Sequence, residues 1–241
     1  MHSCIKTRLA ALTLSIILPG AVSAASFDSL ENLSQEQFLK ISENIAAAVH
    51  YKGVGPAEPL GLIGFDLGIE VSSTEIDEEL FGEASSGEID QSEMIIPRLH
   101  VNKGLPFGLD VGAAISVVPG TDIKALSGEL RYALVSGGAL TPAVGIRGSH
   151  AIVEGVDEFD LSSSALEITA SKGFAILTPY AGTGIVKTTV TPNNIGTLTE
   201  ESFDQKKVFV GVTINLGFAI TLEADKTDDY RTYSAKVGFR F

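Results

Sequence analysis

The sequence lacks several features that would place it in a common protein class. It has no tryptophan and one cysteine, Cys4, among 241 residues, which excludes a scaffold held by intrachain disulfides. No apolar run reaches the roughly 18 residues that a membrane-spanning helix needs. Basic residues are scarce, 17 Lys and Arg against 30 Asp and Glu with a net charge of −13, which argues against a nucleic-acid-binding protein. The chain is therefore soluble or enters a membrane without helices.

Residues 1–24 have the layout of a secretory signal peptide. Lys6 and Arg8 precede an apolar run over residues 9–18, and small residues lead up to Ala24. A charged start, a short apolar centre and a small-residue cleavage site are the three parts of such a peptide. We expect cleavage after Ala24, which also removes Cys4. The mature chain then has no thiol nucleophile.

Residues 25–59 form a separate N-terminal segment with one amphipathic helix over about residues 34–49. Ser34 and Gln37 have the spacing of a capping box, and Gly53 with the prolines that follow ends the helix. Its apolar face carries Phe38, Ile41, Ile45 and Val49. We expect this helix to pack on whatever follows it. The alternative is a plug, or a periplasmic cap at one end of a barrel.

From residue 60 to residue 241 the hydrophobic period changes from 3.6 to 2, which is the period of β-strands. We count ten strands, although eight or twelve remain open because strand boundaries are imprecise. The runs cover residues 63–71, 94–102, 107–117, 123–134, 140–152, 161–172, 177–189, 207–216, 218–225 and 233–241. No linker or longer repeat divides this region, so it is expected to be one all-β domain.

A membrane barrel explains these strands better than a soluble sandwich. They run about 9–12 residues, the length of a tilted membrane strand, and their second face is rich in Gly, Ala, Ser and Thr. Short connections near residues 102–106, 135–139, 172–176 and 215–217 alternate with longer ones, most of them acidic. Outer-membrane barrels have tight periplasmic turns and long outer loops. We therefore predict a transmembrane up-and-down antiparallel barrel with both termini on the periplasmic side.

The predicted lumen face carries charges of both signs. Opposite charges in a confined lumen should pair, because an unpaired charge with little water is costly. Arginine side chains also fill a barrel of ten strands, which argues against a general porin. The predicted lumen charges are Asp66, Glu70, Asp110, Glu129, Glu167 and Glu223 with Arg98, Arg131, Arg147, Lys236 and Arg240.

The acid excess lies in the long connections. Residues 73–93 hold eight acids and no Lys or Arg. Binding of divalent cations is one interpretation of this cluster. A solvated, mobile loop is the preferred one, because the acids lack the spacing of a calcium loop. No metal site or cofactor is predicted.

No catalytic constellation is present in the sequence. Ser149 and His150 are neighbours, so a strand turns their side chains to opposite faces. Neither a Gly-x-Ser-x-Gly motif nor a phosphate loop occurs. A serine paired with His100 across strands would give a lipid hydrolase, but a hydrogen-bonded lumen histidine is the preferred interpretation.

The C-terminal strand carries the most specific signal. Phe241 is the last residue, and Tyr233, Val237 and Phe239 lie on the same face of the strand. With the signal peptide and the alternating strands, this resembles the closing strand of Gram-negative outer-membrane β-barrel proteins, of the small outer-membrane-protein-A and opacity-protein type. The resemblance covers roughly residues 60–241. It implies location in the outer membrane, contact with outer-membrane lipid, and recognition by periplasmic chaperones and the barrel-assembly machinery.

The sequence as a whole predicts a non-enzymatic outer-membrane barrel with acidic surface loops and an envelope-structural or surface-interaction role. A narrow channel for a small solute is the second interpretation, and an outer-membrane lipid hydrolase is the third.

Overall fold

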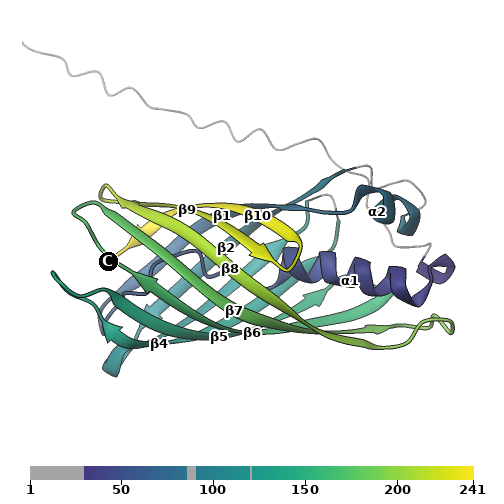
Figure 1. Cartoon of the computed structure of the whole chain (residues 1–241), viewed down its shortest axis with the longest axis horizontal. Coiled ribbons are helices and arrows are strands. Elements are labelled where there is room, and N and C mark those ends of the chain that lie inside the picture. The colour runs from purple at the N-terminus through teal and green to yellow at the C-terminus, as the bar shows by residue number, and fades with distance from the viewer. Residues whose placement is uncertain (1–29, 86–90, 120) are drawn as a thin grey trace, which may run out of the picture.

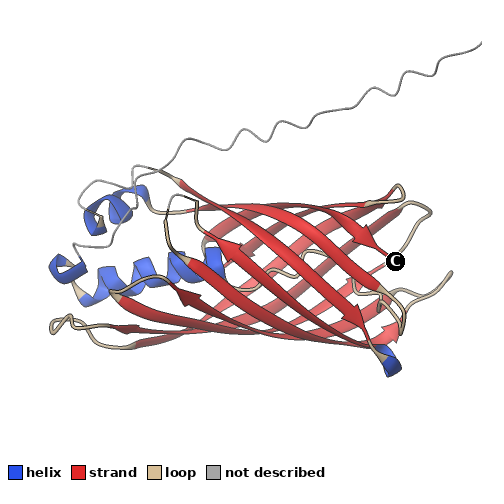
Figure 2. Cartoon of the chain, turned by 180° about the vertical axis from the view of Figure 1, so that it is seen from behind, coloured by secondary structure: helices blue, strands red, loops and turns tan. Residues whose placement is uncertain are grey.

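The computed structural model describes residues 30–85, 91–119 and 121–241. Ten antiparallel strands close into one barrel, in which strands adjacent in the sequence pair and β1 also pairs with β10 (Figures 1 and 2). The all-β up-and-down barrel of ten strands is therefore confirmed. The predicted signal peptide lies outside the described residues. The strands are β1 (Phe65–Glu75), β2 (Glu93–Gly104), β3 (Leu109–Val117), β4 (Lys124–Ser136), β5 (Ala143–Glu154), β6 (Phe159–Ser171), β7 (Leu177–Pro192), β8 (Glu201–Asn215), β9 (Ala219–Thr227) and β10 (Tyr230–Arg240).

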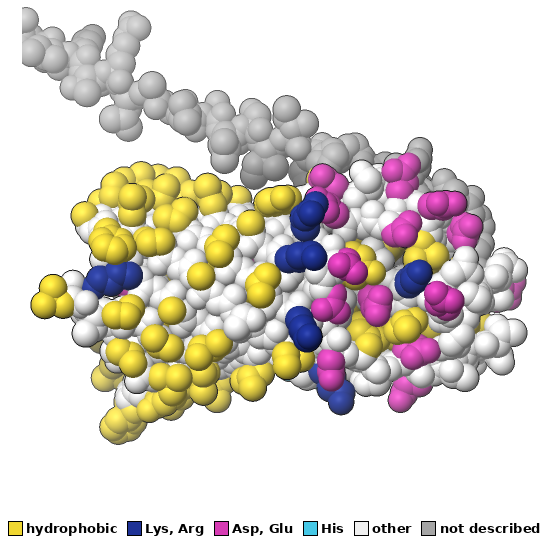
Figure 3. All heavy atoms as spheres, in the orientation of Figure 1, with side chains coloured by type: hydrophobic (Ala, Val, Ile, Leu, Met, Phe, Trp, Pro, Cys, Tyr) yellow, Lys and Arg dark blue, Asp and Glu magenta, His cyan; other side chains and the backbone are white. Residues whose placement is uncertain are grey.

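The outside of the barrel is apolar and the inside is largely polar. In β1, Leu67, Ile69 and Val71 are about half exposed, whereas Asp66 and Glu70, which alternate with them, are buried. Exposed apolar side chains cover the part of the barrel nearer the C-terminus, and acidic residues cover the opposite end (Figure 3). A closed barrel with this inverted distribution is the arrangement of a membrane β-barrel, because its outer surface faces lipid and all its backbone groups pair around the ring.

No helix among the described residues has both the length and the apolar character that crossing a membrane requires.

The two ends of the barrel differ in their connections. The connections at residues 105–108, 137–142, 172–176 and 216–218 are at the end where Phe241 lies, and the first of them contains the short helix η2 (Pro106–Gly108) (Figure 1). The connections at residues 76–92, 118–123, 155–158, 193–200 and 228–229 are at the other end. We call these the short-turn end and the long-loop end.

The N-terminal segment passes through the barrel. Helix α1 (Gln35–Val49), preceded by η1 (Leu30–Asn32), lies at the long-loop end (Figure 1). Every residue from 44 to 57 is buried, and the chain reaches the short-turn end before β1 starts at Phe65. We call residues 35–57 the plug. The sequence predicted only that this helix packs on the domain that follows it. The structure matches the alternative interpretation, in which the helix plugs the barrel.

This path corrects the expected topology. The chain entering β1 and the C-terminus do share the short-turn end, but residues 30–49 lie at the opposite end (Figure 1). An even number of strands determines only that the start of β1 and the end of β10 lie at the same end of the barrel. It carries no information about a preceding segment that runs back through the lumen.

At the long-loop end, the inside of the barrel is apolar rather than polar. Phe38, Ile41 and Ile45 of α1 belong to one buried cluster with Phe159 and Val190 of the wall. The capping box forms as predicted: the Ser34 hydroxyl accepts from the Gln37 backbone N–H at 3.3 Å, and the Ser34 backbone N–H donates to Gln37 Oε1 at 3.0 Å. The apolar face of α1 is therefore buried against the wall of its own barrel.

The first acidic connection is also more ordered than expected. β1 continues to Glu75, and α2 (Glu78–Ala84) follows, with Asp77 as its N-cap. Leu80 and Phe81 are buried in the same apolar cluster. The expectation of a solvated, mobile loop is wrong for this part, because each turn of α2 contributes an apolar side chain that packs near α1.

Candidate functional site: the plugged lumen

The structure places all eleven predicted lumen charges inside the barrel. Ten are buried, and the Arg240 side chain is 14% exposed. Three further charged residues join them: Lys207 and Asp225 from the wall and Lys52 from the plug. Among the described residues, the wall thus has seven carboxylates and six cations facing inward, and Lys52 supplies the seventh cation.

The first ion-pair group lies where α1 ends. Glu70 on β1 accepts from Arg98 Nη1 at 2.6 Å through Oε1, and its Oε2 lies 2.6 Å from His100 Nε2. Arg98 also donates from Nη2 to the carbonyl of Ala48 at 2.8 Å, and that carbonyl belongs to the last turn of α1. The ring of Tyr51 contacts the His100 ring edge-on, with centroids 5.8 Å apart. The wall therefore supplies a charged hydrogen-bond donor to a backbone carbonyl at the C-terminus of α1, where carbonyls lack partners within the helix.

The second group surrounds Arg147 on β5. Its Nε donates to Glu167 at 2.6 Å, its Nη1 lies 3.6 Å from Glu129, and Glu167 lies 2.9 Å from Lys207 Nζ. The guanidinium lies against Gly53 of the plug, where an added Cβ would be 1.5 Å from Arg147 Nη1. A side chain at position 53 would therefore displace the guanidinium from the position in which it pairs with Glu167 and Glu129.

The third group joins the plug to the wall directly. Lys52 Nζ donates to both carboxylate oxygens of Asp225, at 3.2 and 3.1 Å, and to Thr232 Oγ1 at 3.2 Å. Neither charged side chain has any exposed surface. Asp225 has no other cation within salt-bridge distance among the described residues. Lys52 is therefore the one plug side chain that neutralises a wall charge.

The last group lies toward the short-turn end. Asp66 pairs with Lys236 at 3.2 Å and Arg240 at 3.0 Å, and Asp110 pairs with Arg131 at 2.6 Å. These arginines also bind plug-side backbone: Arg131 donates to the Pro56 carbonyl at 3.1 Å and Arg240 to the Glu58 carbonyl at 2.6 Å. The Ala57 N–H donates to Ser171 Oγ at 2.9 Å. The plug is thus held along its length.

Sequence reasoning missed three members of this network for two different reasons. Lys207 and Asp225 occupy alternating inward positions of β8 and β9, so the period that identified the other charges also pointed to them. Lys52 follows the helix in a segment without periodicity, and no local signal indicated that it faces a buried carboxylate.

Outside the lumen network, Glu43 of α1 is partly buried near the 228–229 turn. Burial, followed by the negative charge of Asp228, raises the pKa of this carboxyl above its usual value of 4.5. The docked plug therefore favours the protonated form of Glu43.

The remaining histidines give no complete catalytic group. His150 Nδ1 lies 2.9 Å from Ser164 Oγ on the exposed outer face. A nucleophile and its base need a third group that orients the base, and within the described residues no acid hydrogen-bonds His150. His100 is bound to Glu70 rather than to a serine. Within residues 30–85, 91–119 and 121–241, no group of three or more His, Cys, Asp or Glu could hold a metal ion.

The predicted assembly residues lie on the outer surface. Tyr233, Val237 and Phe239 are exposed by 58%, 52% and 61%. Phe241 pairs with Phe65 through two backbone hydrogen bonds of 2.8 and 3.0 Å, and their rings lie 5.9 Å apart. The last residue thus helps to close the β1–β10 seam.

Comparisons with known proteins give the following. No protein-family model and no curated protein matches the sequence. Among solved structures, the N-terminal barrel domain of OprF from Pseudomonas aeruginosa matches at 13% identity and a TM-score of 0.35, covering 72% of this chain and 97% of that one. Neisserial surface protein A matches at 11% and 0.35, covering 73% and 97%. The KdgM porin matches at 10% and 0.37, covering 74% and 99%.

Proposed function

We propose that this protein is an outer-membrane barrel that its own N-terminal segment keeps closed, with an envelope-structural or surface-interaction role. The observation that carries the proposal is the unbroken burial of residues 44–57 along the lumen. A barrel of this size has little axial space, and here α1 and the extended chain occupy it. The docked plug therefore occupies the route that a solute would take through the lumen.

Three features support the outer membrane as the location. They are the signal peptide expected at residues 1–24, the apolar outer surface, and the closed antiparallel ring of strands. If the long loops face outward, as in barrels of this type, α1 and α2 lie at the cell surface among acidic connections. Residues 30–34, which precede α1, then lie at the outer surface as well.

A gated narrow channel is the second candidate, because the wall does not depend on the plug for most of its charge pairing. The pairs Glu70–Arg98, Asp110–Arg131 and Glu167–Arg147 are all made within the wall. An open lumen would therefore stay polar around these ion pairs, while the apolar wall residues that α1 covers at the long-loop end, such as Phe159 and Val190, would be uncovered. Among the described wall carboxylates that form ion pairs, only Asp225 would lose its cation.

A reversible crosslink separates the two candidates. A Cβ built on Gly145 lies 3.8 Å from the Cβ of Ala57, which matches the mean Cβ–Cβ separation in disulfides, about 3.8 Å. The Ala57→Cys/Gly145→Cys variant is therefore expected to form a disulfide that fixes the plug in the lumen, without competition from other cysteines once the signal peptide is removed.

Single-channel recording of the full mature chain in planar bilayers provides the measurement. A permanently closed barrel stays silent in the wild type, and in the crosslinked variant before and after reduction. A gated channel shows openings in the wild type that disappear on oxidation and return with dithiothreitol. A steady large conductance that oxidation leaves unchanged would contradict both.

A further inference from the structure

A row of cations crosses the outer face of β7–β10. Lys187, Lys206, Lys226 and Arg231 are all exposed, one on each strand. Lys226 is directly opposite Arg231. Lys206 is diagonal to Lys226, and Lys187 is diagonal to Lys206. Diagonal neighbours on one face of a sheet lie about 7–8 Å apart at Cα, so the four side chains form a continuous row, which we call the cation row.

The cation row lies at the border of the apolar surface, on the side of the long-loop end. Toward the short-turn end, the next outward residue of each strand is uncharged: Ile185, Val208, Ala224 and Tyr233. Toward the long-loop end, acids such as Asp204 and Asp229 follow. Figure 3 shows Lys and Arg side chains between the apolar surface and the acidic end of the barrel.

The neighbouring acidic side chains form only weak ion pairs with two of these cations. Lys226 lies 3.6 Å from Asp229, and Arg231 lies 3.7 Å from Glu75. The side chains in both pairs are 47% exposed or more, and exposed pairs of this geometry contribute little. Both cations can therefore bind another anion at small cost.

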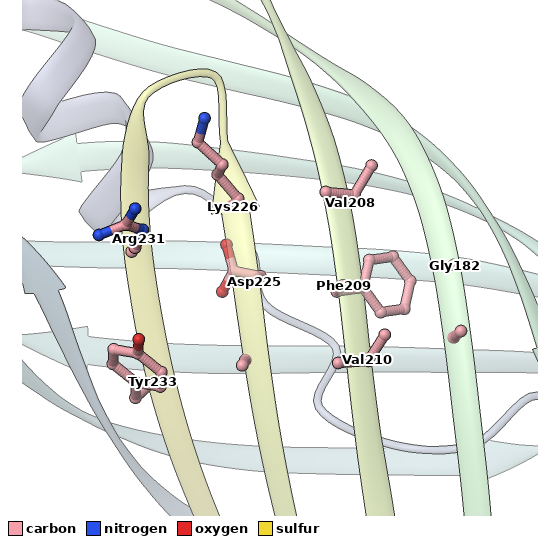
Figure 4. Close-up of a pocket in the computed structure, with 10 residues that line it drawn as sticks. Gly182, Val208, Phe209, Val210, Asp225, Lys226, Arg231 and Tyr233 are labelled. Carbon is pink, nitrogen blue, oxygen red and sulfur yellow. The ribbon is translucent and has the colours of Figure 1, made fainter.

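A groove lies directly beneath the cation row. Ala224 is opposite Val210 on one side and Tyr233 on the other, so a small side chain stands between two large ones. The hollow there has a volume of about 360 Å³ and extends up to Lys226 and Arg231 (Figure 4). A second hollow of about 680 Å³ adjoins it along Leu222 and Ala235. Both open onto the apolar outer surface.

We propose that this face binds one lipid whose headgroup carries two phosphates, with the phosphates on the cation row and an acyl chain in the groove. Phosphates bind Lys and Arg through charge-assisted hydrogen bonds, and basic clusters at the membrane interface bind anionic headgroups. The row crosses four strands with one direct step of about 5 Å and two diagonal steps of about 7–8 Å, roughly 20 Å in total at Cα. One phosphate occupies only part of that length, so a headgroup with two separated phosphates fits it better.

The site does not depend on the plug. Its residues all lie on the outer face, and it remains whether the lumen is open or closed. With the long loops outside, the site faces the outer leaflet. A failure of this proposal therefore leaves the proposed closed lumen unaffected, whereas the position of the site in the outer leaflet rests on the orientation given under the proposed function.

Lipid binding can be measured with the full mature chain in phosphatidylcholine nanodiscs, by native mass spectrometry at rising concentrations of added lipid. The probes are diphosphorylated lipid A, its monophosphorylated form and phosphatidylglycerol, with inorganic phosphate as a competitor. The Lys226→Gln/Arg231→Gln variant removes charge from the row, and Ala224→Phe fills the groove without changing charge. Lys124→Gln, which removes one outward charge from β4, and Ala113→Phe, which makes the same apolar change on the outer face of β3, are the controls; the single variants Lys226→Gln and Arg231→Gln match Lys124→Gln in charge.

We expect the diphosphorylated lipid to bind in preference to the other two. The double charge variant should weaken its binding about tenfold or more, since each cation near an anionic lipid surface contributes about a factor of five. Ala224→Phe should weaken it about threefold or more, because the acyl chain loses buried contact. The two controls should bind like the wild type.

Four results would overturn the proposal. The first is equal binding of the three lipids, and the second is equal loss of binding in the controls and the site variants. The third is a wild-type dimer that Ala224→Phe dissociates with no lipid preference, since the groove would then be an interface between two copies of the chain. Competition by inorganic phosphate alone, without any effect of Ala224→Phe, would likewise exclude an acyl chain in the groove.

Discussion

Replacing Lys52 with methionine tests how the plug is held. The variant keeps most of the side-chain volume but leaves Asp225 as a buried carboxylate without a cation. Removing one partner of a buried ion pair costs about 3–5 kcal/mol. Asp225 keeps a hydrogen bond from Thr227 Oγ1 at 3.2 Å, so we expect the lower end, about 3 kcal/mol. That change multiplies the undocked fraction of the plug by roughly 150.

Hydrogen exchange of residues 44–57, followed by mass spectrometry in lipid nanodiscs, measures docking directly. Exchange in this segment should accelerate by about two orders of magnitude in Lys52→Met, while the strands remain protected, because the wall pairs persist. Single-channel recording of the same sample reports whether undocking opens a conducting path.

Two further variants make the result interpretable. Lys40→Met removes an equal charge from the exposed face of α1, where Lys40 is 57% exposed and 3.7 Å from Glu36; its effect should stay within about 0.5 kcal/mol. Lys52→Met/Asp225→Leu removes both buried charges and should restore most of the protection. Unchanged exchange in Lys52→Met, or equal acceleration in Lys40→Met, would refute the role of the Lys52–Asp225 pair.

Three other outcomes are expected. Val210→Arg places a charge on the lipid-facing surface of β8 and should lower the free energy of unfolding in lipid by about 2–4 kcal/mol, whereas Ser202→Arg, near the long-loop end of the same face, should cost less than 1 kcal/mol; equal losses would contradict the assigned membrane position. Phe241→Ser removes an aromatic side chain from the β1–β10 seam and should reduce the heat-modifiable, folded band on a gel, while Phe174→Ser at the same end should not; normal folded levels of Phe241→Ser would argue against a role in assembly. Because the pKa of Glu43 is raised in the docked state, plug docking should be strongest below the ordinary glutamate pKa and weaken as the pH rises through the raised pKa. Glu43→Gln should remove this pH dependence of hydrogen exchange, and its persistence in the variant would assign it to another group.

The strands and their facing were accessible from the sequence because both depend on local alternation. In β10, Tyr233, Val237 and Phe239 alternate with small or charged residues, and the structure turns the two sets to opposite sides of the wall. The errors lie at strand ends. β8 starts at Glu201, six residues before the predicted start at residue 207. Residues 201–206 are polar apart from Phe203 and therefore show no alternation of apolar and polar residues.

The sequence by itself determined the barrel, the charged inner face and the existence of one amphipathic helix, since periods of 2 and 3.6 residues and a capping box are properties of short segments. Only the tertiary structure decided what fills the lumen. The positions of Lys52 against Asp225 and of Gly53 against Arg147 join residues 94 to 173 positions apart. Such contacts exist only once the wall has closed around the segment. The irregular chain between α1 and β1 has no hydrophobic period from which they could be predicted.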